Sequence, residues 1–433
     1  MNAKTCLSLL LLCLVPLWSL AQPLRHVPLD STLPFIRYDL NQLYIGSDST
    51  VLNALFDKWQ RVAETGEGSL SIVHIGASHV QAGTLPHEVR RNILRAFPDR
   101  VGDRGMVFPY SAAARCNNPG DYAVRSDRPL ELCRCVYKEP TKQLGLCGIS
   151  VTAQDSTARI DMALRNEGID YQTNQVILFG YESDSLPHDT AVVPLLGYQG
   201  KEIAPSYVDP ATRRYVFNLE SATDSFRIVL PCGPGQMFTL TGVYLGHHGG
   251  GISYHSIGVN GAAVRSYLDK CPYLTRDLRL LRPDLVIFGI GINDASGPNF
   301  DSALFHAEYR RLADSIRSVS PSCAFLYVTN NDSYRRVGRS RVANTRALQV
   351  RAVMRRLAQE TQGAMWDQFG VMGGLKSMTR WRNAKLGQRD RVHFTNAGYA
   401  LIGDLLTNAL FDAINHHSAQ NTPQDAGSRY LSY

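Results

Sequence analysis

Apolar positions near the start of the chain alternate between a helical period and short continuous runs. Apolar residues recur at helical spacing over 50–64, a β-branched apolar run occupies 70–75, and a second helical pattern covers 85–97. These patterns predict a helix, a buried strand and a second helix. Such an alternation of helices and strands is typical of an α/β sheet.

The same alternation returns in the last third of the chain. Apolar runs predict buried strands, and amphipathic segments predict helices between them. The predicted strands are 284–289, 324–329 and 364–366, and the predicted helices are 303–319, 342–362 and 396–415. One parallel sheet can accept the strands of both α/β segments.

The segment between these two parts has a different pattern. From about residue 116 to 249, helical periodicity is nearly absent and short alternating strands follow turn-rich pieces. The predicted strands are 151–161, 175–181, 214–219, 226–230 and 237–244. We therefore expect an α/β fold, with a first part over 22–115 and a second part over 250–416, interrupted by a β-sandwich of jelly-roll type over 116–249.

The two ends of the chain carry other signals. Lys4 precedes the apolar run 6–20, and small residues before Gln22 fit a cleavage site, so residues 1–21 read as a signal peptide. No later segment has the length of a membrane span. We expect an exported protein, periplasmic or secreted, with a polar, disordered tail over 417–433.

Composition narrows the class of partner. The 433 residues are 44% hydrophobic and carry a formal charge of +7, with the densest positive cluster between Arg335 and Arg346. That cluster reads either as a solvated surface or as an attraction for an anionic polymer such as a cell-wall glycan. Nucleic acid is not expected, because no basic–aromatic binding motif is present.

The chain has nine cysteines, and cleavage of the expected signal peptide would remove two of them. Seven is an odd number, so at least one thiol is free or pairs between chains. Cys133, Cys135 and Cys147 are close in sequence and are the best disulfide candidates, since export permits disulfides. A zinc cluster is disfavoured because the chain lacks a second ligand pair at metal-binding spacing.

Ser78 is the candidate nucleophile. It follows the predicted strand 70–75 through Gly76-Ala77 and precedes a predicted helix, as expected for a serine presented at the mouth of a parallel sheet. No serine satisfies the G-x-S-x-G elbow, because Val80 stands at the last glycine position here, which argues against a lipase-type α/β-hydrolase. The alternative is that Ser78 only caps the helix that follows.

Three further residues can complete a serine site. His393 is the candidate base, and Asp390, three positions earlier, can orient its imidazole. Asn293 follows the predicted strand 284–289, where its amide can donate to a developing oxyanion. The alternative is that Asn293 and its neighbour Asp294 form an ordinary turn.

Together these segments resemble the SGNH hydrolases, also called GDSL-type esterases, which carry a serine, a glycine, an asparagine and a histidine in four ordered blocks. Ser78, Gly261, Asn293 and the pair Asp390 and His393 match the four blocks in order. The similarity covers about residues 50–115 and 250–415. Gly258 lies three residues from Gly261 and is the alternative for the second block.

The resemblance implies a mechanism. It makes Ser78, Asp390 and His393 the catalytic residues. It assigns the oxyanion hole to the N–H of Ser78, the N–H of Gly261 and the amide of Asn293, with no metal or cofactor. The family usually has aspartate where this chain has Ala77, which leaves room for an altered or lost activity.

An exported SGNH domain interrupted by a β module is similar to the peptidoglycan and polysaccharide O-acetylesterases of bacterial envelopes. The expected activity is therefore removal of O-acetyl groups from a carbohydrate polymer. An esterase or lipase on other acyl esters, an O-acetyltransferase and a non-catalytic glycan-binding protein are the alternatives. Neither the oligomeric state nor the sugar follows from the sequence.

Overall fold

The computed structural model describes residues 23–29, 33–97, 102–114, 116–165, 167–182, 191–247 and 251–421. The signal peptide expected over 1–21 lies outside these residues, as does most of the expected tail. Residues 417–421 are not a disordered tail but the end of the last helix, because the His417 ring packs against Phe56 and its Nε2 lies 2.7 Å from an oxygen of Asp57. No helix within the described ranges has both the length and the apolar character of a membrane span.

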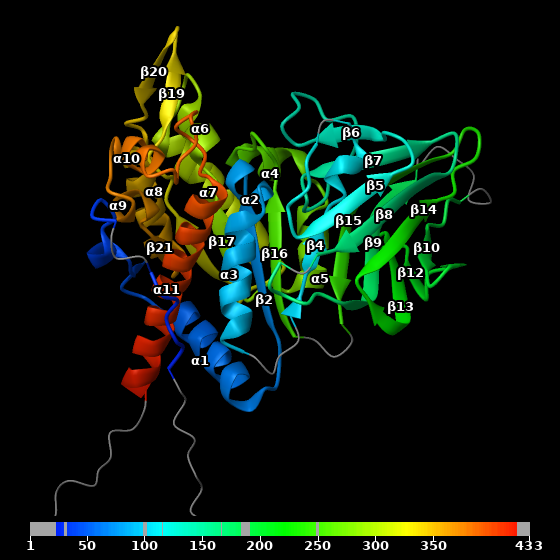
Figure 1. Cartoon of the computed structure of the whole chain (residues 1–433), viewed down its shortest axis with the longest axis horizontal. Coiled ribbons are helices and arrows are strands. Elements are labelled where there is room, and N and C mark those ends of the chain that lie inside the picture. Colours follow the sequence, from blue (N-terminus) through cyan, green and yellow to red (C-terminus); the bar gives the residue numbers. More distant parts are fainter. Residues whose placement is uncertain are drawn as a thin grey trace, which may run out of the picture.

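A seven-stranded sheet forms the centre of the α/β domain, with strand order β1-β21-β18-β17-β2-β16-β3 (Figure 1). All neighbouring strands are parallel except the edge strand β1, which runs antiparallel to β21. The strands are β1 (Leu43–Ile45), β2 (Leu70–Gly76), β3 (Gly102–Asp103), β16 (Ile252–Gly258), β17 (Leu285–Gly289), β18 (Ala324–Val328) and β21 (Ala364–Trp366). The predicted α/β fold with a central parallel sheet is confirmed.

Helices cover both faces of this sheet. Alternate side chains of its buried strands therefore belong to two different cores. Ile72 of β2 joins the core under the first helix layer, and Val73 joins the core on the other face. The first layer consists of α1 (Thr50–Thr65), α3 (Thr84–Arg95) and α11 (Asn396–Asn421). The second consists of α4 (Val264–Lys270), α5 (Leu274–Leu281), α7 (Ser302–Arg317) and α8 (Ala347–Glu360). Four short helices complete the α/β domain: α2 (Ser78–Gln81), α6 (Ile292–Ser296), α9 (Gln368–Val371) and α10 (Ser377–Asn383).

The long helix expected over 342–362 is wrong at its start. Its first residues belong to a hairpin of β19 (Tyr334–Val337) and β20 (Ser340–Ala343), and α8 begins only at Ala347. Gly338 has a φ of +58°, which suits the tight turn between the two strands. Pairing across that turn outweighs the local helical pattern.

The inserted domain consists of two antiparallel sheets that share one core (Figure 1). One sheet has the order β11-β10-β14-β8-β5, and the other runs β12-β13-β9-β15-β7-β6 with β4 also paired to β15. The strands are β4 (Gly105–Val107), β5 (Tyr122–Ser126), β6 (Glu131–Arg134), β7 (Ile149–Gln154), β8 (Ala158–Leu164), β9 (Thr173–Glu182), β10 (Leu195–Tyr198), β11 (Lys201–Ile203), β12 (Tyr207–Asp209), β13 (Arg214–Thr223), β14 (Ser225–Leu230) and β15 (Met237–Gly246).

Two expectations for this domain need correction. The single strand expected over 151–161 is two strands, β7 and β8, because the chain turns at Asp155, where φ is +58°. The domain also starts earlier than residue 116, since β4 pairs with β15. A three-residue strand is too short to produce a readable alternation.

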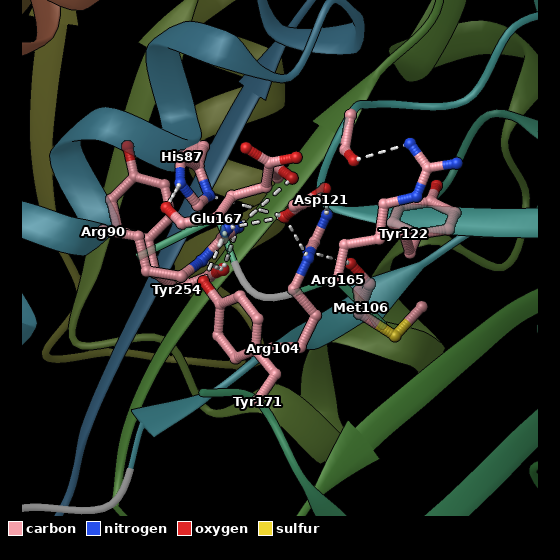
Figure 2. A network of polar contacts seen from close by, with 12 residues as sticks. His87, Arg90, Arg104, Met106, Asp121, Tyr122, Arg165, Glu167, Tyr171 and Tyr254 are labelled. Carbon is pink, nitrogen blue, oxygen red and sulfur yellow. Dashed lines mark hydrogen bonds and ion pairs between the residues drawn. The ribbon is translucent and has the colours of Figure 1, made fainter. Parts of the chain in front are cut away.

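A buried ionic network joins the two domains (Figure 2). Asp121, just before β5, lies 3.1 Å from the guanidinium of Arg90 on α3 and 2.7 Å from that of Arg104. Arg90 also donates to the carbonyl of Tyr254 in β16. Burial raises the pKa of Asp121, but the two arginines and His87 outweigh it and hold that pKa far below its ordinary value. The carboxylate is therefore ionised and anchors both guanidinium groups at the junction.

The expected disulfides among Cys133, Cys135 and Cys147 do not form, because all seven cysteines of the described residues are free. Cys135 instead contacts the thiol of Cys271 on the helix layer of the α/β domain. All three side chains are buried in the apolar core.

Candidate active site

Ser78 lies at the carboxyl end of β2, in the middle of the parallel sheet. The strand ends at Gly76, and Ser78 opens the short helix α2, held by hydrogen bonds from the Val80 and Gln81 N–H groups to the Ala77 carbonyl. Ligand sites of open α/β sheets lie at this edge. The Ser78 side chain is only partly buried, so a substrate can reach it.

The structure brings Ser78, His393 and Asp390 together although 315 residues separate the serine from the histidine. His393 Nε2 lies 2.8 Å from Ser78 Oγ, and His393 Nδ1 lies 2.6 Å from Asp390 Oδ2. With its Nδ1 proton donated to Asp390, the imidazole accepts the Ser78 hydroxyl proton at Nε2. This is the arrangement of nucleophile, base and orienting carboxylate that acyl transfer requires.

Asp390 is fixed by more than the imidazole. Its Oδ1 accepts the backbone N–H groups of Val392 and His393 at 2.9 and 3.0 Å. Burial raises the pKa of Asp390, but these bonds and the His393 side chain outweigh it and hold the pKa below its ordinary value. The carboxylate is therefore ionised at neutral pH and able to stabilise an imidazolium.

Gly261 lies in the loop after β16, and Asn293 lies in the first turn of α6 beside it. The Asn293 amide donates to the Ala262 carbonyl at 2.9 Å, which leaves its second N–H for another acceptor. Within the described residues, the backbone N–H groups of Ser78 and Gly261 donate to no other residue. Two backbone donors and one amide are a sufficient set for an oxyanion hole.

The geometry separates the roles of Gly258 and Gly261. A Cβ on Gly258 would lie 2.4 Å from the backbone nitrogen of Gln81, so Gly258 permits β16 to pack against α2. Gly261 has open space around it and a φ of +86°, as a turn residue has. Gly258 thus serves packing, and Gly261 keeps its N–H accessible.

Sequence reasoning missed two residues that hold the Gly261 loop. The buried Gln81 side chain accepts the Asn260 N–H at 2.6 Å, and Asp294 accepts the Val264 N–H at 3.1 Å. Gln81 lies three residues after Ser78 on the same helix face, a spacing that could have suggested a shared role. Asp294 was read only as part of a turn.

His79 is a further residue that sequence reasoning missed. Its ring centre lies 5.2 Å from that of His393, and its Nδ1 lies 2.8 Å from the Tyr399 hydroxyl. Burial, aided by His393, lowers the pKa of His79 to about 3, so this imidazole is neutral at ordinary pH. The uncharged His79 ring therefore packs beside the His393 imidazole.

Ala77, where the family usually has aspartate, is 1% exposed and belongs to the apolar core. A carboxylate there would be buried, whereas the alanine packs without cost. Among the residues that the structure describes, no group of three or more His, Cys, Asp or Glu side chains could hold a metal ion.

A comparison with protein families matches the later part of the chain. Residues 235–401 match a family model described as the GDSL-like Lipase/Acylhydrolase family. That match includes Gly261, Asn293, Asp390 and His393 but not Ser78, which precedes the inserted domain. No curated protein matches the chain.

The solved structures that match this chain differ in how much of it they cover. A structure described as "Peptidoglycan O-acetylesterase in action, 5 min" has 21% identity and a TM-score of 0.70, covering 86% of this chain and 99% of the other. An acetyl xylan esterase has 17% identity and a TM-score of 0.30, over 37% of this chain and 80% of the other. A GDSL-like lipase from Bacteroides thetaiotaomicron has 16% identity and a TM-score of 0.29, over 37% of this chain and 76% of the other.

The first of these likenesses extends over both domains, and the family match covers three of the four sequence blocks. The first block, with Ser78, precedes the matched residues and meets them through the contact of Ser78 Oγ with His393 Nε2. Residues 235–401 therefore resemble the GDSL-like Lipase/Acylhydrolase family, and the contacts of Ser78 with His393 and of His393 with Asp390 give the α/β domain the catalytic arrangement of a serine ester hydrolase.

Proposed function

We propose that the protein removes O-acetyl groups from a carbohydrate polymer, with Ser78 as nucleophile. The observation that carries the catalytic part is the unbroken contact chain from Ser78 Oγ through His393 to Asp390. The substrate class is supported by the likeness in fold, over both domains, to a peptidoglycan O-acetylesterase.

In the first half-reaction His393 Nε2 takes the Ser78 proton as Oγ attacks the acetyl carbonyl carbon. The oxyanion accepts hydrogen bonds from the N–H groups of Ser78 and Gly261 and from the Asn293 amide. Collapse of this intermediate expels the sugar oxygen, which takes the proton from His393, and leaves an acetyl group on Ser78.

In the second half-reaction His393 deprotonates a water molecule, which attacks the acetyl-enzyme. The same donors hold the second oxyanion. When the bond to Oγ breaks, His393 returns its proton to Ser78 and acetate leaves. Asp390 remains ionised throughout and stabilises the imidazolium in both halves.

The proposal includes export. A positive residue, an apolar run and small residues before position 22 support a signal peptide over residues 1–21. The substrate is then a polymer of the cell envelope or its surroundings, met in the periplasm or outside the cell.

Acetate release from O-acetylated peptidoglycan tests the proposal. Wild type should release acetate, and Ser78→Ala should reduce the rate to background, while the matched control Ser318→Ala, at the residue that follows α7, should not. Equal rates for wild type and Ser78→Ala would exclude the catalytic assignment. A preference for long-chain p-nitrophenyl esters over acetate would instead identify a lipase, and faster transfer to an added sugar than to water would identify a transferase.

A further inference from the structure

Arginines crowd the edge of the molecule beside the catalytic loop. Most of them lie on the hairpin of β19 and β20, which projects from the α/β domain (Figure 1). The others come from the loop that carries Asp390. We call the set the arginine rim: Arg335, Arg336, Arg339, Arg341, Arg389 and Arg391.

The hairpin is attached directly to the catalytic loop. The Tyr334 N–H donates to the Arg391 carbonyl at 3.0 Å, and the guanidinium of Arg391 lies 4.8 Å from the centre of the Tyr334 ring. Arg341 donates to the backbone oxygen of Asp390. The arginine rim therefore begins within two residues of His393.

The charges of the arginine rim are not neutralised by the protein. None of its six guanidinium groups forms an ion pair with a carboxylate of the described residues. The segment 334–346 contains no acidic residue, and the single carboxylate of the loop, that of Asp390, is taken by His393 and two backbone N–H groups. Like charges placed this closely repel one another, a cost that a bound anion would relieve.

Arg346 shows what a structural arginine looks like in the same stretch. It turns inward, and its guanidinium donates to the backbone carbonyls of Ala295, Gly297 and Pro298. By contrast, Arg336, Arg339 and Arg389 are exposed. The sequence cluster from Arg335 to Arg346 thus contains the inward-turned Arg346, the partly buried Arg335 and the exposed Arg336, Arg339 and Arg341.

We propose that the arginine rim binds carboxylate groups of an anionic glycan, next to the acetyl ester that the catalytic residues hydrolyse. The guanidinium fork matches a carboxylate in a bidentate way, and several such groups in a row suit a polymer with repeated acidic sites. This proposal rests on the proposed function and narrows its substrate class to acidic polysaccharides. Since the rim adjoins His393, a chain bound there passes Ser78.

The test compares the double variant Arg339→Glu/Arg389→Glu with wild type on three substrates: O-acetylated peptidoglycan, uncharged O-acetylated xylan and p-nitrophenyl acetate. The ratio of kcat/KM for peptidoglycan to that for p-nitrophenyl acetate should fall about tenfold, since charge steering is worth at least that much. The ratio for xylan should stay near the wild-type value. The control Arg61→Glu/Arg279→Glu makes the same change in net charge at exposed sites on α1 and α5.

Salt gives a second measurement that does not depend on the variant folding well. Wild-type kcat/KM on peptidoglycan should drop between low and high sodium chloride, because the screening length shortens, while hydrolysis of p-nitrophenyl acetate should not. An unchanged ratio in the variant, or equal salt dependence on all three substrates, would overturn the proposal. Hydrolysis of p-nitrophenyl acetate without acetate release from either polymer would instead count against the proposed function.

Val337 and Val342 on the hairpin are exposed, so a membrane surface is the alternative partner for the arginine rim. Sedimentation with vesicles of phosphatidylglycerol and phosphatidylcholine decides this. Binding of wild type but not of the rim variant, together with an unchanged substrate ratio, would replace the glycan by a lipid surface.

Discussion

Replacing Gly258 by alanine tests how tightly the position of Ser78 is specified. Gly258 ends β16, and its backbone touches the turn that presents the serine. A Cβ there would lie 2.4 Å from the Gln81 nitrogen and 2.9 Å from the Ala77 carbonyl oxygen. Both are backbone atoms of the turn around Ser78, so no side-chain rotation can relieve the clash.

The distances set the size of the effect. Cβ contacts under 3.0 Å are essentially never seen, so β16 and α2 must separate by at least about 0.6 Å. Forcing atoms into a packed core costs about 1–3 kcal/mol. A displacement approaching 1 Å can cost roughly 100-fold in rate. We therefore expect kcat for p-nitrophenyl acetate to fall by about 10- to 100-fold.

The assay is steady-state hydrolysis combined with thermal unfolding of the same preparation. Gly120→Ala is the matched control, because a Cβ at Gly120 meets nothing within 4 Å and should leave both kcat and Tm as in wild type. A Gly258→Ala enzyme with kcat within twofold of wild type would refute the reasoning, since the turn at Ser78 would then tolerate the shift.

Three other substitutions test separate parts of the structure. Asp390→Asn keeps a side-chain oxygen that can accept the Val392 and His393 N–H groups but favours the wrong imidazole tautomer, so kcat/KM should fall about 10⁴-fold with little change in Tm; a loss under tenfold would contradict the assigned role. Burial raises the pKa of Asp294 from 3.8 to about 6, which disfavours the ionised form by roughly 3 kcal/mol. That cost is absent below pH 3.8 and complete above pH 6, so Asp294→Asn should raise Tm at pH 8 but not at pH 3.5, and an equal effect at both would exclude it. Asp121→Asn leaves two buried guanidinium groups uncompensated and should destabilise the fold by about 3–5 kcal/mol in a urea titration; a change below 1 kcal/mol would show that the junction is not anchored there.

The parts of the fold that the sequence predicted are those set by local periodicity. Helix α1 buries Leu52, Leu55, Phe56, Trp59 and Val62, the side of the helix that its spacing indicated. The hairpin of β19 and β20 was missed because its stability comes from pairing across Gly338, which no period reveals. Strand β4 was missed because three residues carry no readable alternation.

The catalytic contacts divide in the same way. Ser78, Asn293, Asp390 and His393 could be chosen because each follows or precedes a predicted element in a family order. The bond from Asn260 to Gln81 could not, because it joins residues 179 positions apart and depends on how α2 packs against the end of β16. The choice between Gly258 and Gly261 also depends on the folded structure. A Cβ at Gly258 would clash with backbone atoms of the neighbouring turn, whereas a Cβ at Gly261 would not.

The inserted domain explains how the first two blocks of the site meet. Strands β2 and β16 pair in parallel, with Gly76 opposite Gly258, and the entire β domain lies between them in sequence. Ser78 follows the first of these glycines and Gly261 the second, so this register places both residues just beyond the same edge of the sheet. Arg90 fixes that return, because it bonds the Tyr254 carbonyl in β16 and Asp121 at the start of the β domain. Strand β16 therefore contacts the junction network at Tyr254 and leads at its other end to the loop that carries Gly261.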